Sequence, residues 1–265
     1  MKYLTNKDLL REIHLSKNSY SVFADPSYAD YDVILPGLDR INRLTISQAR
    51  KERATKLRDK VNSTREKADA IDKIDPKSIP NTEVVFRIMT WDHVPLSPGR
   101  KKTPKITSDH HVKVNFPPFQ HYKLDDEGKP YCVGKSHWRG DLEKGHFCKD
   151  KGKMTNDLAK MFLKLCERYS SRSNWRGYTY VDEMRGQALL QLSMIGLQFD
   201  ESKSNNPFAY YTAAITNSFT RILNLEKRVQ NIRDDILEAN NMSPSYTRQL
   251  NNEEAIRAGR EDSGE

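Results

Sequence analysis

Apolar residues recur at helical spacing in the second part of the chain, from Met154 onward. A repeat of three to four residues predicts three helices there: residues 154–170, residues 180–199, and a third from Pro207 to about Glu238. Proline suits a helix start because its missing N–H would have no intrahelical partner in the first turn. We therefore expect a helical domain over residues 154–240, followed by a polar, disordered tail over residues 241–265.

The first part of the chain, residues 1–80, has a weaker apolar pattern and more charge. Thr5 and Asp8 form a capping pair for a short helix that ends near Lys17. A second helix is predicted from Leu38 to Ala70, where ten Lys or Arg residues stand against five acids. Its sparse apolar stripe fits either a solvated helix docked along one edge or a basic helix lying on nucleic acid or a large partner.

Residues 81–153 alternate between β-strand and loop patterns. A run of branched and aromatic residues, Glu83 to Thr90, predicts a strand. Prolines then recur from Pro95 to Pro130, and this density excludes a regular helix, so we expect a proline-rich extended arm. The fold class expected for the whole chain is mainly α: a helical bundle in the C-terminal half, preceded by a basic helix and an extended, β-containing arm.

The composition indicates a basic protein with a modest fraction of hydrophobic residues. Of its 265 residues 36% are hydrophobic and 30% charged, and 44 Lys and Arg against 36 acids give a net charge of +8. This excess favours polyanionic partners, although many basic enzymes share it. Three cysteines, an odd number, fit a reducing compartment, and no stretch resembles a signal peptide or a membrane span. We expect a cytoplasmic protein that does not bind membranes.

Candidate metal ligands occur in one basic, glycine-containing segment, with the spacing C-x4-H-x8-H-x-C: Cys132, His137, His146 and Cys148. Four such side chains could hold tetrahedral zinc. The spacing matches no standard zinc motif, so the alternative is a loop or hairpin with incidental His and Cys. The sequence contains no P-loop, HExxH or GxSxG motif. We therefore expect no enzyme activity and no cofactor other than zinc.

The predicted helix after Pro207 has an unusual mixture of side chains. On a helical period Phe208, Ile215, Phe219 and Ile222 face the core. The remaining positions offer rings that stack on bases, amides and hydroxyls that reach base edges, and a guanidinium that binds phosphate. The candidate nucleic-acid contacts are Tyr210, Tyr211, Thr212, Asn217, Thr220 and Arg221. The alternative is a core helix with an ordinary polar face.

A set of short motifs in this region has a recognisable order: Gly177-Tyr178-Thr179, then Phe199-Asp200, then Asn206-Pro207-Phe208-Ala209-Tyr210, with Thr212, Ile215 and Thr220-Arg221 following. In this order and spacing the chain resembles region 2 of bacterial sigma factors, most closely the late-transcription sigma factors of T-even-like phages. The resemblance covers residues 158–233. It implies a specificity subunit that binds the host RNA polymerase core through its largest catalytic subunits and directs initiation at AT-rich late promoters.

The resemblance also implies roles for individual residues. The core-binding face would comprise Asp182, Glu183, Gln187, Gln191 and Gln198. The residues matching the readers of the promoter −10 element are Asn217, Thr220 and Arg221. Two features depart from the wider family: Ala213 and Ala214 stand where primary sigma factors have two wedging tryptophans, and no helix-turn-helix for the −35 element is recognisable.

Late phage factors also dock on the sliding clamp through a hydrophobic-acidic tail, but Ile256 is the one hydrophobe of that kind in the final 15 residues here. The resemblance therefore implies a sliding clamp or a phage co-activator as a further partner, but the sequence of the tail does not support clamp binding. The residues alone are also compatible with two other functions. One is a basic nucleic-acid-binding accessory protein, and the other is a zinc-containing nuclease or structural protein built around Cys132 to Cys148.

Overall fold

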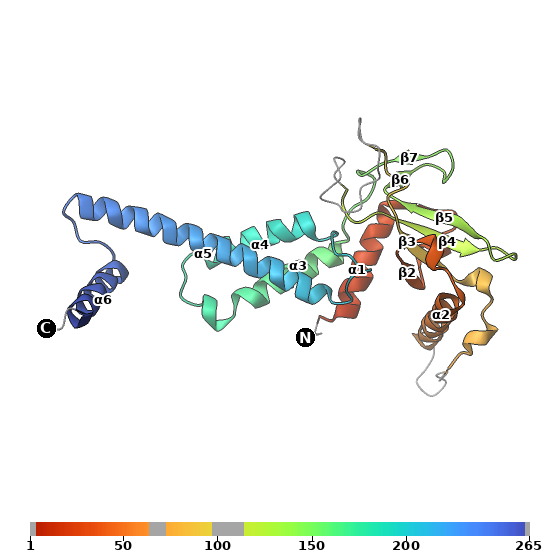
Figure 1. Cartoon of the computed structure of the whole chain (residues 1–265), viewed down its shortest axis with the longest axis horizontal. Coiled ribbons are helices and arrows are strands. Elements are labelled where there is room, and N and C mark those ends of the chain that lie inside the picture. The colour runs from red at the N-terminus through yellow and green to blue at the C-terminus, as the bar shows by residue number, and fades with distance from the viewer. Residues whose placement is uncertain (1–3, 64–72, 97–113, 263–265) are drawn as a thin grey trace. The chain divides into compact units, whose positions relative to one another are not determined.

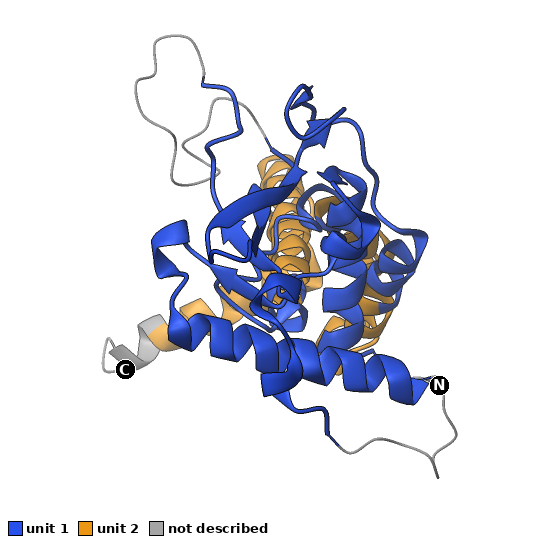
Figure 2. Cartoon of the chain, turned by 90° about the vertical axis from the view of Figure 1, so that its right-hand side faces the viewer, with its two compact units in different colours: residues 1–164, 192–211 blue, residues 165–191, 212–265 orange. Residues whose placement is uncertain are grey.

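The computed structural model describes residues 4–63, 73–96 and 114–262 (Figure 1). The chain divides into two compact units, one of residues 1–164 with 192–211 and the other of residues 165–191 with 212–265 (Figure 2). Within the described residues there are six α-helices, a five-stranded sheet and a two-stranded sheet. Helices form most of this regular structure, as the apolar pattern predicts.

The first unit is built on the five-stranded sheet, with strand order β1-β5-β4-β3-β2. Its strands are β1 (Ser21–Phe23), β2 (Val33–Leu35), β3 (Phe86–Met89), β4 (Phe119–Leu124) and β5 (Pro130–Ser136). β2 and β3 are parallel, whereas the other neighbours are antiparallel. A separate ladder joins β6 (Trp138–Arg139) to β7 (His146–Phe147).

This sheet differs from the predicted arrangement of the first half. β1 and β2 come from residues 1–80 and pair with strands from residues 81–153, so those two segments form one structure rather than two. β4 begins directly after Pro117 and Pro118, inside the segment that we expected to be an extended arm. Proline excludes a helix there, but it does not prevent a strand from starting at the next residue. The basic patch around residues 98–105 lies outside the described residues.

Helix α2 (Arg43–Ser63) covers one face of the sheet. Its Ala49 and Ala54 join a buried cluster with residues of β2 and β3, including Phe86 and Ile88. The small alanines allow close packing where the sequence offers few large apolar residues. α2 is thus a docked helix, and the last predicted residues of the segment Leu38–Ala70 lie outside the described part.

Helix α1 (Asn6–Ser19) packs against the other face of the sheet (Figure 1). The expected capping box is present, because Thr5 accepts from the Asp8 N–H and Asp8 accepts from the Thr5 N–H. Side chains alternate along a strand, so Arg87 of β3 points away from the cluster under α2. It lies against His14 of α1 and His121 of β4.

Three further helices contribute to both units: α3 (Asn156–Ser170), α4 (Val181–Ile195) and α5 (Pro207–Ala239). They match the three predicted helices, but the chain does not divide at the expected boundary near Lys153. Residues 241–265 contain helix α6 (Tyr246–Asp262), where we expected disorder. Its start is held by Asp234, which accepts hydrogen bonds from the N–H and hydroxyl of Ser245 at 2.9 and 2.6 Å.

Candidate functional site

The solvent face of α5 within the second unit holds three of the predicted nucleic-acid contacts. Asn217, Thr220 and Arg221 are exposed. Ile215 and Phe219, on the other side of the helix, are fully buried. A rotation of about 100° per residue separates these two sets, so the helix presents one amide, one hydroxyl and one guanidinium on a single solvent face.

The buried side of α5 is anchored by aromatic side chains of the same unit. Phe219 packs against Tyr169 and Trp175, with ring centroids 5.0 and 5.1 Å apart. The Tyr169 hydroxyl lies 2.8 Å from the Thr216 hydroxyl. These contacts fix the rotation of α5 about its axis and so determine which residues face solvent. Trp175 lies between the predicted helices 154–170 and 180–199, and its size is the signal in the sequence for a core position, because tryptophan is highly buried on average.

The two tyrosines at the start of α5 belong to the first unit, and one of them, Tyr211, is not available for the predicted contact. Tyr211 is fully buried and donates a hydrogen bond to the Gly196 carbonyl at 2.5 Å. Burial raises its pKa. Its ring cannot stack on a base in this conformation, so we remove it from the candidate contacts. The spacing contained this information, because Tyr211 precedes Ile215 by four residues and Phe219 by eight.

Tyr210 and Thr212 have intermediate positions. Tyr210 is half-buried, with its ring edge-on to Phe199 at a centroid distance of 5.6 Å. Thr212 is also half-buried, and its carbonyl accepts the Thr216 hydroxyl at 2.8 Å. Neither side chain is as accessible as Asn217, Thr220 or Arg221.

The predicted polymerase-binding residues lie mainly on α4. Glu183, Gln187 and Gln191 are spaced by four residues and therefore share one helix face, while Met184 and Ala188 are fully buried. Asp182 is exposed and forms an ion pair with Arg185 at 2.9 Å. Gln198 is exposed but belongs to the first unit. The second unit alone thus holds four of the five residues.

The four candidate zinc ligands do not form a cluster. No group of three or more His, Cys, Asp or Glu side chains suited to a metal ion occurs within residues 4–63, 73–96 and 114–262. His137 is fully buried against Phe116, with ring centroids 4.1 Å apart, and burial lowers its pKa to about 3. His146 instead lies exposed on β7, and Cys132 is half-buried on β5 with its thiol towards the Gly134 carbonyl. The backbones of His137 and Cys148 are neighbours, since the Cys148 N–H donates to the His137 carbonyl at 2.7 Å, but the four side chains do not form a metal-binding group among the described residues, so the zinc prediction has no support in this arrangement.

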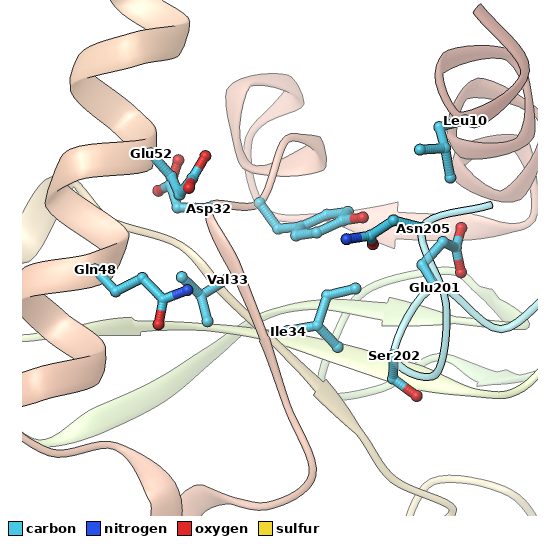
Figure 3. Close-up of a pocket in the computed structure, with 10 residues that line it drawn as sticks. Leu10, Asp32, Val33, Ile34, Gln48, Glu52, Glu201, Ser202 and Asn205 are labelled. Atoms are coloured by element: carbon cyan, nitrogen blue, oxygen red, sulfur yellow. The ribbon is translucent and has the colours of Figure 1, made fainter. Parts of the chain in front are cut away.

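A pocket of about 420 Å³ in the first unit is a feature that sequence reasoning missed. Asp32 and Glu52 stand on one side of it, and Glu201 and Asn205 stand on the other (Figure 3). Glu201 is ion-paired to buried Lys17 at 2.6 Å, and Asp32 accepts a hydrogen bond from the Val85 N–H at 2.9 Å. Burial raises the pKa of Asp32. Two of the acids that line the pocket, Glu201 and Asp32, are thus bound by other groups of the protein.

Arg87 is buried near this pocket and interacts with rings rather than carboxylates. Its Nε donates to the His121 Nε2 at 2.9 Å, and its guanidinium lies 3.9 Å from the Tyr31 ring centroid and 3.7 Å from that of Phe119. Burial lowers the pKa of both His14 and His121, and the adjacent guanidinium lowers it further. Neutral imidazoles and aromatic faces thus surround the cation, which indicates a structural role in the core.

Comparisons of this chain with protein-family models, with curated proteins and with solved structures gave no match. None of the helices in the described part of the chain combines the length and apolar character needed to cross a lipid bilayer.

Proposed function

We propose that this protein is a sigma-type specificity subunit of RNA polymerase that directs initiation at AT-rich promoters. The observation that carries the proposal is the solvent face of α5, where Asn217, Thr220 and Arg221 are exposed while Ile215 and Phe219 are buried. The motif order that resembles sigma region 2 places its DNA readers at these three positions. The resemblance and the exposure are independent reasons for the same assignment.

Each of the three side chains has a chemistry suited to an unpaired promoter strand. An amide such as that of Asn217 pairs with the adenine edge through two hydrogen bonds, and a threonine hydroxyl accepts or donates to several bases. Arg221 would neutralise a phosphate or hydrogen-bond to a base. The net charge of +8 adds a general attraction to DNA.

Docking on the polymerase core is assigned to the α4 face formed by Glu183, Gln187 and Gln191, with Asp182 beside it. Polar and acidic side chains on a rigid helix suit a basic helical partner surface, because complementary charge sets orientation and on-rate. In this proposal α4 holds the polymerase while α5 contacts the non-template strand.

Strand separation would differ from that of a primary sigma factor. Ala213 and Ala214 carry no ring to insert between bases, and Tyr211 is buried. The rings that solvent reaches at the start of α5 are those of Phe208, which is exposed although its spacing predicts a core position, and Tyr210, which is half-buried. We therefore propose that this subunit captures an easily melted AT-rich strand, or acts with a co-activator, rather than wedging the duplex open.

Binding of labelled single-stranded AT-rich DNA by the complex of the full chain with purified bacterial core polymerase tests the proposal. Asn217→Ala/Arg221→Ala should weaken DNA binding at least about tenfold, since each base contact contributes roughly 1–3 kcal/mol. Retention of core binding by this variant would show that α4 is intact.

The matched control is Asn251→Ala/Arg257→Ala, which removes the same side-chain types from exposed positions of α6. This variant should bind DNA as the wild type does. Equal losses in the two variants would mean that binding depends on total charge, as in a basic accessory protein. Failure of the wild type to bind core polymerase would contradict the sigma proposal.

A further inference from the structure

An apolar stripe on the second half of α5 is half exposed. Its residues are Leu225 (51% exposed), Val229 (51%), Ile232 (50%) and Ile236 (57%), and we call them the α5 stripe. Figure 1 shows this half of α5 continuing past the ends of α3 and α4. Isolated apolar residues at a surface are ordinary, but four in register along one helix indicate an interface.

The spacing of the α5 stripe is that of a coiled coil. Its residues follow one another at intervals of four, three and four, and buried Ile222 continues the series three residues before Leu225. A repeat averaging 3.5 residues keeps a narrow seam facing a second helix. Ile222, Val229 and Ile236 occupy one position of this repeat, and Leu225 and Ile232 occupy the other, so both seam positions are filled by large aliphatic side chains.

The charges beside the stripe determine which partner fits. Glu226 and Arg233 flank it on one side, and Arg228 and Asp235 flank it on the other. Each side therefore carries one acid and one base, separated by one heptad. A partner helix needs the complementary order, and a second copy of the same helix supplies it when it runs in the opposite direction.

We propose that the α5 stripe is the interface of a homodimer in which two copies of α5 pack antiparallel. Val229 of each copy then faces Ile232 of the other, and Leu225 faces Ile236. The two-fold axis brings Glu226 beside Arg233 and Arg228 beside Asp235, each pair occurring twice. In a parallel dimer Arg221 would face Glu226, but Arg228 would face Arg233, so two favourable pairs would be offset by two like-charge pairs, whereas all four pairs of the antiparallel dimer are favourable.

Existing contacts within the chain leave these groups able to pair. No ion pair of Arg228 or Arg233 occurs among the described residues. Asp235 already binds Arg248 at 2.9 Å through Oδ1, and its second oxygen can accept another donor. Among the proposed DNA contacts, Thr220 lies on the other side of the helix from the stripe. Arg221 lies one heptad before Arg228, on the flank of the stripe but outside the paired segment from Leu225 to Ile236.

Sedimentation equilibrium of the full chain, over a wide range of concentrations, tests the dimer. The wild type should shift from monomer to dimer as concentration rises, and Val229→Asp/Ile232→Asp should remain monomeric. Both replaced side chains are half exposed, and circular dichroism would verify the fold. Leu250→Asp/Ile256→Asp is the matched control: it places two acids at exposed apolar positions of α6 and should still dimerise.

The orientation is tested with Arg233→Glu. In the antiparallel dimer this change places a second carboxylate beside Glu226 at two sites and should weaken dimerisation about threefold to tenfold. Adding Glu226→Arg restores opposite charges and should recover the wild-type affinity. In a parallel dimer the introduced carboxylate would face Arg228, so Arg233→Glu would strengthen association and overturn the antiparallel assignment.

Two other results would overturn the dimer itself. The first is a wild-type chain that stays monomeric at every concentration. The second is a dimer that persists in Val229→Asp/Ile232→Asp. If the wild type is monomeric and this variant loses binding to purified core polymerase, the polymerase occupies the stripe instead. None of these results depends on DNA binding, so failure here is distinguishable from failure of the proposed function.

Discussion

Buried charges set the chemistry of the first unit at the residue scale. Lys17 has 1% of its side chain exposed and is bound by Glu201 at 2.6 Å and by the Phe199 carbonyl at 2.7 Å. Burial lowers the pKa of Lys17, while the Glu201 carboxylate opposes that shift. Two hydrogen bonds from one ammonium join α1 to the segment that precedes α5, so this ion pair links parts of the chain that are far apart in sequence.

Removing one partner of this pair should be costly. Lys17→Met leaves Glu201 as an uncompensated buried charge, and we expect the free energy of unfolding to fall by about 3–5 kcal/mol in urea denaturation. The double variant Lys17→Met/Glu201→Gln should recover part of the loss. Lys7→Met is the control, because its ion pair with Asp59 is largely exposed and its removal should change the stability far less. If Lys17→Met and Lys7→Met lowered the free energy of unfolding by similar amounts, the buried Lys17–Glu201 pair would not have the stabilising role assigned to it.

Buried histidines should make the first unit sensitive to acid. Burial lowers the pKa of His93 to about 4 and that of His137 to about 3, both below the unfolded value of 6.5. Between the folded and unfolded pKa values the unfolded chain binds more protons, so stability is retained above pH 6.5 and declines as the pH falls below it. For each such group the decline approaches about 1.4 kcal/mol per pH unit.

His137→Asn isolates one of these contributions. His137 has a φ of 51°, a left-handed conformation that asparagine tolerates better than most residues. We expect the slope of unfolding free energy against pH, measured between about pH 6 and about pH 4, to decrease by roughly 1 kcal/mol per pH unit in this variant. His146→Asn, at an exposed position, should leave the slope unchanged. An unchanged slope in His137→Asn would mean that His137 is protonated in the folded state.

At the scale of single elements, α4 and the residue that follows it provide a matched pair of glycines. A Cβ on Gly196 would lie 2.6 Å from the Phe162 ring and 2.7 Å from the Leu192 carbonyl, whereas a Cβ on Gly186 would meet no atom within 4 Å. Gly186 lies inside α4, where glycine is less favourable than alanine. The two positions therefore respond to the same substitution in opposite ways.

Gly196→Ala should lower the free energy of unfolding by about 1–3 kcal/mol, because the ring and carbonyl must move. Gly186→Ala should raise it by about 0.5–1 kcal/mol through helix propensity alone. Thermal unfolding of both variants measures the effects. Destabilisation by Gly186→Ala would show that its exposed position in α4 has been misassigned.

The helices could be predicted from the sequence better than the sheet. α3, α4 and α5 each carry a long helical period, and Thr5 with Asp8 marks the start of α1, so local pattern is sufficient. β1 and β2 are three residues long, which is too short for a clear alternation. The pairing of β2 with β3 joins segments far apart in sequence, and no local pattern contains that information.

The candidate site shows the same limit. Asn217, Thr220 and Arg221 could be predicted as a solvent face because their spacing is helical. The prediction of Tyr211 as a DNA contact is wrong because it rests on residue type, whereas the helical spacing from Ile215 and Phe219 places Tyr211 on the buried side of α5. The hydrogen bonds from Ser245 to Asp234 depend on a turn between α5 and α6, so the helical tail could not be predicted from its polar composition.

At the scale of the whole molecule, the protein combines a sheet-based unit with a helical unit that carries the proposed DNA and polymerase contacts. The second unit holds the α4 face, the α5 face and the α5 stripe. These are different surfaces of α4 and α5. Substitutions on one surface should therefore change polymerase binding, strand capture or self-association without changing the other two.

Run-off transcription with purified bacterial core polymerase on templates with AT-rich promoters tests the central claim most directly. We predict that the wild-type chain redirects initiation to these promoters, and that Asn217→Ala/Arg221→Ala reduces the specific transcript at least about tenfold while core binding is retained. A chain that binds no core polymerase, or a variant that transcribes as well as the wild type, would contradict the account.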